Sequence, residues 1–409
     1  MVRFEIKKVF GSFGSRVAVF LLAGVVILSC YLAIGGVEWI NEQGTPETGF
    51  AAIAKLKQAQ AKWAGELDEE KLYAVIQELQ RINATPEAQS KDYTQNDIAY
   101  GWKQGFMPIR DMMNYAYAGN FSTYDYYLAD SLSLEQAGDF YTNRTKLLKD
   151  FLENGEGKNH FSEKEKAFLM KQYEELETPF YYEYFEGWRQ LLGYVSTVIN
   201  LAALIIGYLV AGIFSNEFRW KSDAIFFTTV HGRNRATSAK IKAGFCIVTA
   251  LYWSAIAIYT LVTLGILGFG GANCPVQLER WKCFYNLTFG QAYLLVVLGG
   301  YIGNLFCAFV TMWVSAKTRT SLVAVTVPFL LIFIPNILAN MDISWLDRVV
   351  ALLTDQLLQL YVVMYYFNVY EIFATVLSAV DILLPLYILL TAAMVPLMYR
   401  EFRRKQIPS

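Results

Sequence analysis

The sequence predicts an all-α polytopic membrane protein with six transmembrane helices and a mainly helical extracellular domain. Hydrophobic residues make up 55% of the 409 residues, and six long stretches of the chain carry no charge. Each stretch meets or nearly meets the length of about 20 apolar residues that a membrane-spanning helix requires. A polar, tyrosine-rich block separates the first stretch from the second. The six stretches are residues 17–37, 191–214, 243–268, 292–315, 320–341 and 382–399.

The first stretch has an alternative interpretation as a secretion signal. Basic residues precede it, and the residues leading to Cys30 loosely resemble a lipoprotein cleavage box. However, the apolar run continues past Cys30 to Val37, which is too long for a cleaved signal. We therefore expect residues 17–40 to be retained as the first transmembrane helix.

Basic residues gather on one side of the six-span arrangement. The opposite side carries residues 41–187, which contain 25 Asp and Glu against 15 Lys and Arg, a local charge of −10, whereas the whole chain has a charge of −1. Because Lys and Arg near span ends favour the cytoplasm, we expect both termini, including the tail 400–409, to be cytoplasmic and residues 41–187 to be extracellular. The basic residues are Arg3, Lys7, Lys8, Arg16, Arg219, Lys221, Arg233, Arg235, Lys240, Lys242, Lys317, Arg319, Arg400, Arg403, Arg404 and Lys405.

Residues 356–370 compete as a seventh span. The segment is apolar and rich in tyrosine, but it is short and lies between Asp355 and Glu371. A seventh span would also move the basic tail to the outside. We interpret the segment as an interfacial or re-entrant helix, because tyrosine favours the headgroup level of a membrane.

The block at residues 41–187 is expected to be helical. Apolar residues recur at helical spacing after Lys71, and Ser162 with Glu165 has the pattern of a capping box. The many aromatic residues fit the core of a small helical domain. They also fit a surface that meets a substrate or guards an exit, and both interpretations stay open.

The cysteines follow the expected topology. Cys30, Cys246 and Cys307 lie in the predicted spans, where they fit as small apolar residues. Cys274 and Cys283 both lie in the outward loop after the third span. We expect a disulfide between these two, because the extracellular side is oxidising. Two free thiols are the alternative.

Several kinds of chemistry lack their residues in this sequence. No phosphate loop of the form GxxxxGK[ST] and no HExxH motif occur, and the histidines are His160 and His231 alone. No span carries an acid or a base in its middle, which argues against a pump driven by protons or sodium ions. We expect no catalytic residue, no metal site and no cofactor in this chain.

The linker at residues 215–242 carries the most informative local pattern. It fits a short amphipathic helix that docks on a soluble partner, with an apolar knob and flanking arginine anchors. It fits equally well a basic loop held at the lipid headgroups. The candidate residues are Glu217 just after the span, the knob Ile225, Phe226 and Phe227, the anchors Arg233 and Arg235, and Lys240 at the start of the next span.

This linker resembles the coupling region of the type-2 ABC exporter permeases. Glu217, the Gly232-Arg233 pair and Lys240 stand where that family tends to have an acid, a Gly/Ser-Arg turn and a lysine. Residues 1–16 resemble the amphipathic elbow helix of the family, and residues 342–381 resemble its outward half-helices. The elbow residues are Arg3, Glu5, Lys7 and Lys8. The large block at residues 41–187 departs from many small members of the family and leaves the substrate open.

The resemblance implies a transporter subunit with no enzymatic activity of its own. Such permeases pair with a second copy or a homologous permease in the plasma membrane. A separate pair of ATPase subunits, which bind ATP and Mg, drives them. In Gram-positive bacteria, similar permeases export peptides, lipids or drugs, or confer immunity to peptide antibiotics. Membrane lipids are expected partners and nucleic acid is not. The alternative is a sensor or immunity protein that binds a ligand through its extracellular domain without transport.

Two further patterns lie inside the predicted spans 188–399. Gly299 and Gly303 form a GxxxG pair, which allows close helix contact. Pro328 and Pro335 are expected to kink the fifth span and so to suit a moving gate. Both patterns are also common in membrane helices that do not move.

Overall fold

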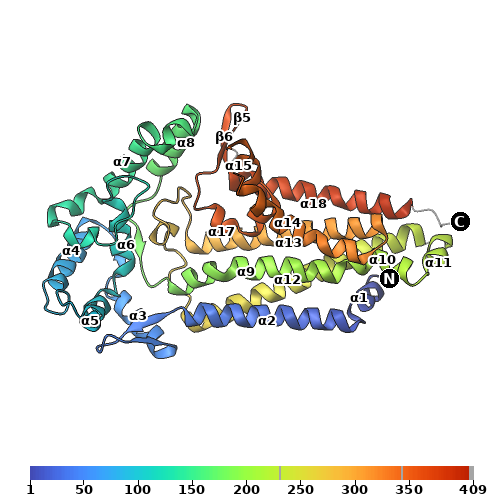
Figure 1. Cartoon of the computed structure of the whole chain (residues 1–409), viewed down its shortest axis with the longest axis horizontal. Coiled ribbons are helices and arrows are strands. Elements are labelled where there is room, and N and C mark those ends of the chain that lie inside the picture. The colour runs from blue at the N-terminus through green and yellow to red at the C-terminus, as the bar shows by residue number, and fades with distance from the viewer. Residues whose placement is uncertain (230–231, 342–343, 405–409) are drawn as a thin grey trace.

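The computed structural model describes residues 1–229, 232–341 and 344–404. A bundle of long helices runs along the longest axis, and a helical domain lies beyond one end of it (Figure 1). Both termini lie at the other end, which we call the terminus end. The fold is mainly helical, at 72% helix.

The six predicted membrane spans are confirmed as six helices long and apolar enough to cross a membrane. Their charged ends extend beyond the apolar runs, because helical hydrogen bonding continues where the side chains become polar. The helices are α2 (Phe13–Gly35), α9 (Glu186–Val210) continuing into α10 (Gly212–Arg219), α12 (Thr237–Leu267), α13 (Phe289–Thr318), α14 (Ser321–Ala339) and α18 (Ala379–Arg403).

A short helix, α1 (Val2–Phe10), precedes the first span at the terminus end. Gly11 and Ser12 separate it from α2, and the Ser12 hydroxyl caps α2 by accepting a hydrogen bond from the backbone N–H of Ser15 at 3.1 Å. The cap supplies an acceptor to one of the unpaired N–H groups of the first helical turn. The two helices are therefore distinct, and α1 is the segment compared above with an elbow helix.

Helices α9 and α13 form the centre of the bundle. In their apolar windows 61% of the residues are buried, against 28–33% in the other four spans. Helix α9 packs against α2, α12 and α13, and α13 packs in turn against α14 and α18. The outer four helices therefore keep broad apolar faces that are free to contact lipid.

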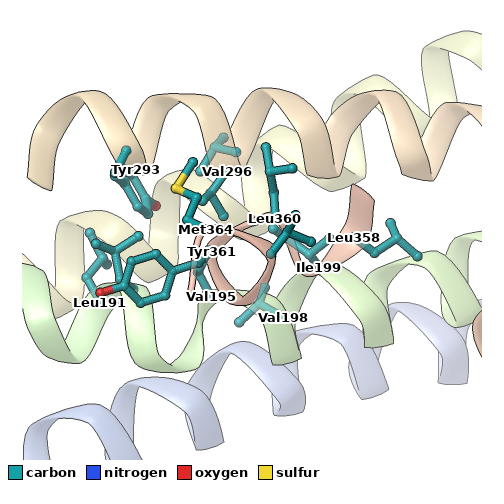
Figure 2. Close-up of a cluster of buried hydrophobic side chains, with 14 of the residues drawn as sticks. Leu191, Val195, Val198, Ile199, Tyr293, Val296, Leu358, Leu360, Tyr361 and Met364 are labelled. Atoms are coloured by element: carbon teal, nitrogen blue, oxygen red, sulfur yellow. The ribbon is translucent and has the colours of Figure 1, made fainter. Parts of the chain in front are cut away.

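The segment after α14 enters the bundle from the domain side. Its elements are α15 (Ser344–Val350), α16 (Thr354–Leu358), α17 (Leu360–Val363), β5 (Val369–Ile372) and β6 (Thr375–Ser378). Leu358, Leu360, Tyr361 and Met364 place their side chains between α9 and α13 (Figure 2). This segment therefore packs inside the helical bundle, and its expected re-entrant position in a membrane stays a prediction.

The single helix predicted for residues 356–370 is wrong. The chain breaks at Gln359, which has φ −123° and ψ 38°, so two short helical turns form instead. A β-hairpin follows, in which Val369 pairs with Ser378 and Phe373 adopts a positive φ of 57° at the turn. Val, Ile and Tyr in these strands favour extended backbone.

The predicted GxxxG pair on α13 does permit a close approach, but the partner is the re-entrant segment. A Cβ atom on Gly299 would lie 3.1 Å from Leu360 Cδ2, and one on Gly303 would lie 2.6 Å from Leu358 Cδ2. Pro328 lies inside α14 and packs against Gly207 of α9, where a larger residue would collide with its ring. Pro335 lies inside the same helix and is also buried.

The helical domain, residues 41–187, is confirmed as mainly helical. The predicted capping box is present, since the Ser162 hydroxyl accepts from Glu165 N–H and the Glu165 carboxylate accepts from Ser162 N–H. The elements are α3 (Phe50–Ala61), α4 (Glu69–Asn83), α5 (Tyr93–Lys103), α6 (Met107–Ala116), α7 (Phe140–Glu153), α8 (Glu163–Glu174), the 3₁₀ turns η1 (Leu128–Ser131), η2 (Leu134–Asp139) and η3 (Glu156–Asn159), and the paired strands β1 (Glu38–Ile40) with β2 (Pro46–Thr48) and β3 (Gly65–Glu66) with β4 (Tyr181–Tyr182).

A buried arginine fastens the domain to the loop between α12 and α13. Arg144 on α7 donates to the carbonyls of Trp281 at 3.2 Å and Cys283 at 2.9 Å. Its guanidinium also lies 3.8 Å from the ring centroid of Tyr173. Because burial disfavours the charged form, the pKa of Arg144 falls below its ordinary value.

The predicted disulfide between Cys274 and Cys283 is wrong, because both cysteines are free and buried. The loop is ordered by backbone contacts instead: the Cys274 carbonyl accepts from Phe289 N–H at 2.9 Å, and the Cys283 carbonyl accepts from Arg144 and Gln277. Burial raises the pKa of Cys274 to about 12 and that of Cys283 to about 11.

We predict that these two thiols react slowly in the folded protein. Raised pKa values leave few thiolates near pH 8, and the thiolate is the reactive form. Alkylation of the native protein in detergent, followed by peptide mass spectrometry, should therefore leave Cys274 and Cys283 unmodified. After unfolding without reductant, both should be alkylated. An intact mass lower by two hydrogens, restored by reductant, would contradict this.

Candidate functional site

The candidate site lies at the terminus end and is built around Lys240, near the start of α12. Lys240 is 1% exposed. Its ammonium nitrogen donates to Glu5 Oε2 at 2.9 Å, to Glu217 Oε1 at 2.8 Å and to the carbonyl of Ile213 at 2.9 Å. An ammonium group has three N–H donors. All three are therefore matched by acceptors from two other helices.

Glu217 on α10 is the second centre of this network. Besides Lys240, its Oε1 atom accepts from Lys8 Nζ of α1 at 2.6 Å, and its Oε2 atom accepts from the Ser222 hydroxyl at 2.6 Å. Lys8 also lies 3.7 Å from Glu5 of its own helix. Residues expected separately in an elbow helix and in a linker are thus brought into one cluster.

We call Glu5, Lys8, Glu217 and Lys240 the charge cluster. It holds two acids and two bases, so its formal charge is zero. Taking charged groups out of water is costly, and partners in good geometry offset that cost. Loss of one member would leave an uncompensated charge in a buried place. The charge cluster therefore joins α1, α10 and α12 through buried ion pairs.

An aromatic cluster lies beside the charge cluster. Phe402, in the last turn of α18, is fully buried. Its ring centroid lies 4.6 Å from that of Phe214, 5.4 Å from Phe226 and 5.3 Å from Phe227. Phe218 completes the aromatic cluster at 6.0 Å from Phe402. The C-terminal span is thereby tied to the linker.

The prediction of Phe226 and Phe227 as an exposed knob is therefore wrong. Phe227 is 4% exposed and Phe226 is half-buried, because Phe402 offers both an apolar surface within the chain. Both lie on the short helix α11 (Asp223–Thr228). The side chain of Ile225, the third knob residue, lies outside the part of the chain that the structure describes.

Arg233, which was expected to anchor a partner, instead makes hydrogen bonds within the chain. It lies in the helical turn Gly232–Ala236 that leads into α12. Its guanidinium donates to the carbonyl of Phe227 at 3.1 Å and to the carbonyl of Arg403 at 3.3 Å. Arg233 thus joins α11 to the C-terminal end of α18, where a cation also meets the negative end of the helix dipole. Arg235 is exposed.

The outer side of the terminus end carries an exposed basic surface. Trp220 is 51% exposed, and Lys8 Nζ lies 5.6 Å from its ring centroid. Lys221 follows with a positive φ of 54° and is exposed. Arg3 and Lys7 of α1 are exposed too. A basic surface with one indole therefore remains available after the inner residues are paired.

Several residues of the site escaped sequence reasoning. Phe402 lies among basic residues at the C-terminus, and such a segment predicts only a contact with the membrane surface. The aromatic residues that Phe402 contacts lie about 180 positions earlier in the chain. No sequence pattern indicates Ser222 as a residue of the site. Phe214 was assigned to the second span as an ordinary apolar residue. The aromatic spacing of Phe214 and Phe218, one helical turn apart, was the available signal for a buried aromatic face.

The other predicted site residues lie elsewhere. The glycines of α13 lie against the re-entrant segment, the prolines lie inside α14, and the two cysteines lie in the α12–α13 loop. Within the described part of the chain, no group of three or more His, Cys, Asp and Glu side chains is placed to hold a metal ion.

Comparison of this chain with models of protein families, with curated proteins and with solved structures finds no match.

We predict that Lys240→Met lowers the free energy of unfolding by about 3–5 kcal/mol, because two buried carboxylates lose their shared cation. The double variant Lys240→Met/Glu217→Gln should be less destabilised than the single one, since the remaining Glu5 and Lys8 form a neutral pair. Unfolding of the purified protein in detergent measures both.

Lys242→Met is the matched control, because Lys242 is exposed on the same helix. This control should change the stability little. If the effects at Lys240 and Glu217 simply add, the two residues are not coupled.

Proposed function

We propose that this chain is the membrane-spanning permease subunit of an ABC exporter. In this proposal it forms the translocation path for a hydrophobic or amphipathic substrate, a peptide, a lipid or a drug. Two six-span units pair, and a separate pair of ATPase subunits supplies the energy from ATP and Mg. The six candidate spans indicate a multi-pass membrane protein, and this supports the proposal.

The charge cluster is the observation that carries the proposal. A permease without its own phosphate loop must receive its energy mechanically, through a segment that touches the ATPase. Lys240 and Glu217 join the linker to α12, and Glu5 and Lys8 join it to α1. A push on the linker would therefore move two membrane-associated helices together.

The aromatic cluster connects the linker to the last span as well. Phe402 packs against Phe226 and Phe227 on α11, and Arg233 bonds to the end of α18. Force applied at α11 would reach α10, α12 and α18 through packed side chains. Close-packed interiors transmit such displacement.

The contact with the ATPase is proposed to use the exposed surface of the linker. Trp220 replaces Phe227 as the aromatic anchor, because Trp220 is half-exposed and Phe227 is buried. Arg219 and Lys221 flank it. Tryptophan and arginine are the residues that most often anchor protein interfaces.

The membrane orientation follows from charge. We propose that the terminus end is cytoplasmic and the helical domain extracellular. A cysteine at Gln89, exposed in the helical domain, should react with a membrane-impermeant maleimide in intact cells. A cysteine at the exposed Lys221 should react only after the membrane is opened. Labelling of Lys221→Cys from outside would reverse the orientation.

The central test is ATP hydrolysis. The purified chain alone should hydrolyse no ATP, whereas tagged chain purified from its native membranes should retain a P-loop ATPase and show turnover. Trp220→Ala with Lys221→Ala should reduce the retained ATPase by about tenfold or more, because a truncated anchor costs about 2 kcal/mol.

Tyr93→Ala provides the control, since Tyr93 is 87% exposed but lies in the helical domain. Hydrolysis by the chain alone would refute the proposal. Ligand binding by the helical domain with no retained ATPase would instead favour a sensor or immunity protein.

A further inference from the structure

A groove in the helical domain has the form of a ligand site. It encloses about 830 Å³ between α3, α5 and the β1–β2 hairpin. Binding sites for small ligands commonly span about 300–1,000 Å³. The groove lies at the opposite end of the molecule from the charge cluster, and nothing described above uses it.

Three tryptophans line this groove: Trp39, Trp63 and Trp102. Trp63 is held edge-on against Phe106, with ring centroids 4.9 Å apart. Trp102 is 42% exposed. Indole rings in contact with water forgo hydrophobic stabilisation. The exposed Trp102 and the partly buried Trp39 and Trp63 around one hollow therefore indicate a surface that a ligand covers.

Two close contacts fix the walls of the groove. Gln104 accepts from Ile40 N–H at 2.7 Å and donates back to the Ile40 carbonyl at 3.1 Å, which fastens the hairpin to the end of α5. A Cβ atom on Gly105 would lie 2.8 Å from the carbonyl oxygen of Ala59, so only glycine permits this approach of α3. A rigid site loses little entropy on binding.

The groove lining carries three acids and two lysines, and Arg81 beside the lining compensates the third acid. Glu47 is paired with Lys55 at 2.7 Å, and Glu78 is held by Arg81 through two hydrogen bonds of 2.7 Å. The other two charged residues in the lining, Glu42 and Lys62, are exposed and of opposite sign. The lining therefore favours neither a polycation nor a polyanion.

We propose that this groove binds a neutral oligosaccharide. The C–H face of a pyranose ring is apolar and flat, and it matches an exposed indole. The ring hydroxyls both donate and accept hydrogen bonds, and the rim supplies both kinds of partner in Gln43, Glu42 and Lys62. A purely apolar chain would leave these rim groups without partners.

This proposal is independent of the permease function, since it concerns binding by the helical domain alone. A cationic peptide is the competing ligand, because the domain as a whole is acidic. The balanced charges of the groove itself favour the sugar.

The test is calorimetric titration of the full chain, purified in a detergent without a sugar headgroup. The probes are chitohexaose, cellohexaose and maltohexaose, with hexalysine as the competing class. At least one hexasaccharide should bind with a Kd of about 1 mM or tighter. Trp102→Ala should weaken that binding by about tenfold or more, and Trp102→Phe should restore most of it, because both rings offer an aromatic face.

Tyr93→Ala is the matched control, since Tyr93 is an exposed aromatic residue on the same helix but does not line the groove. It should leave binding unchanged. An unchanged melting temperature of Trp102→Ala would show that the domain is still folded. The proposal is overturned if no hexasaccharide binds, if Trp102→Ala binds as the native chain does, or if hexalysine alone binds and loses affinity in Trp102→Ala.

Discussion

The terminus end of this molecule depends on one buried ammonium group. The ammonium group of Lys240 is buried. A buried charge is stable only where every N–H donor has an acceptor. Its acceptors come from α1 and α10, and Lys240 itself belongs to α12. Three segments distant in sequence must therefore assemble before Lys240 is stable. The exposed basic surface outside and the aromatic cluster beside it take their positions from this assembly.

The membrane spans could be predicted from sequence because bilayer thickness demands long apolar runs, which are visible without tertiary contacts. Glu217 and Lys240 could be singled out because they stand at the two ends of the linker, one just after the second span and the other at the start of the third. Their partners Glu5 and Lys8 were noted only as part of a separate helix. The burial of Phe227 could not be foreseen, because it depends on Phe402 at the far end of the chain.

The structures of the α12–α13 loop and of the β5–β6 hairpin could not be predicted from the sequence either. Two nearby cysteines on an oxidising side suggest a disulfide, but Arg144 decides how the Cys283 backbone lies. Strand β5 begins inside residues 356–370, which were expected to form an interfacial or re-entrant helix, because tyrosine and valine suit both settings. In each case a contact between distant segments overrode a local preference.

The core of α7 and α8 is completed by residues from far later in the chain. Leu148, Leu169 and Tyr173 pack with Phe284 of the α12–α13 loop and with Val369 of β5. Domains usually fold in order of synthesis, N-terminal parts first. Here the helical domain leaves the ribosome early, yet it lacks part of its interior until four further spans have been inserted. The helical domain can therefore complete its core only after most of the membrane bundle has been made. A chain truncated before β5 would lack part of that core.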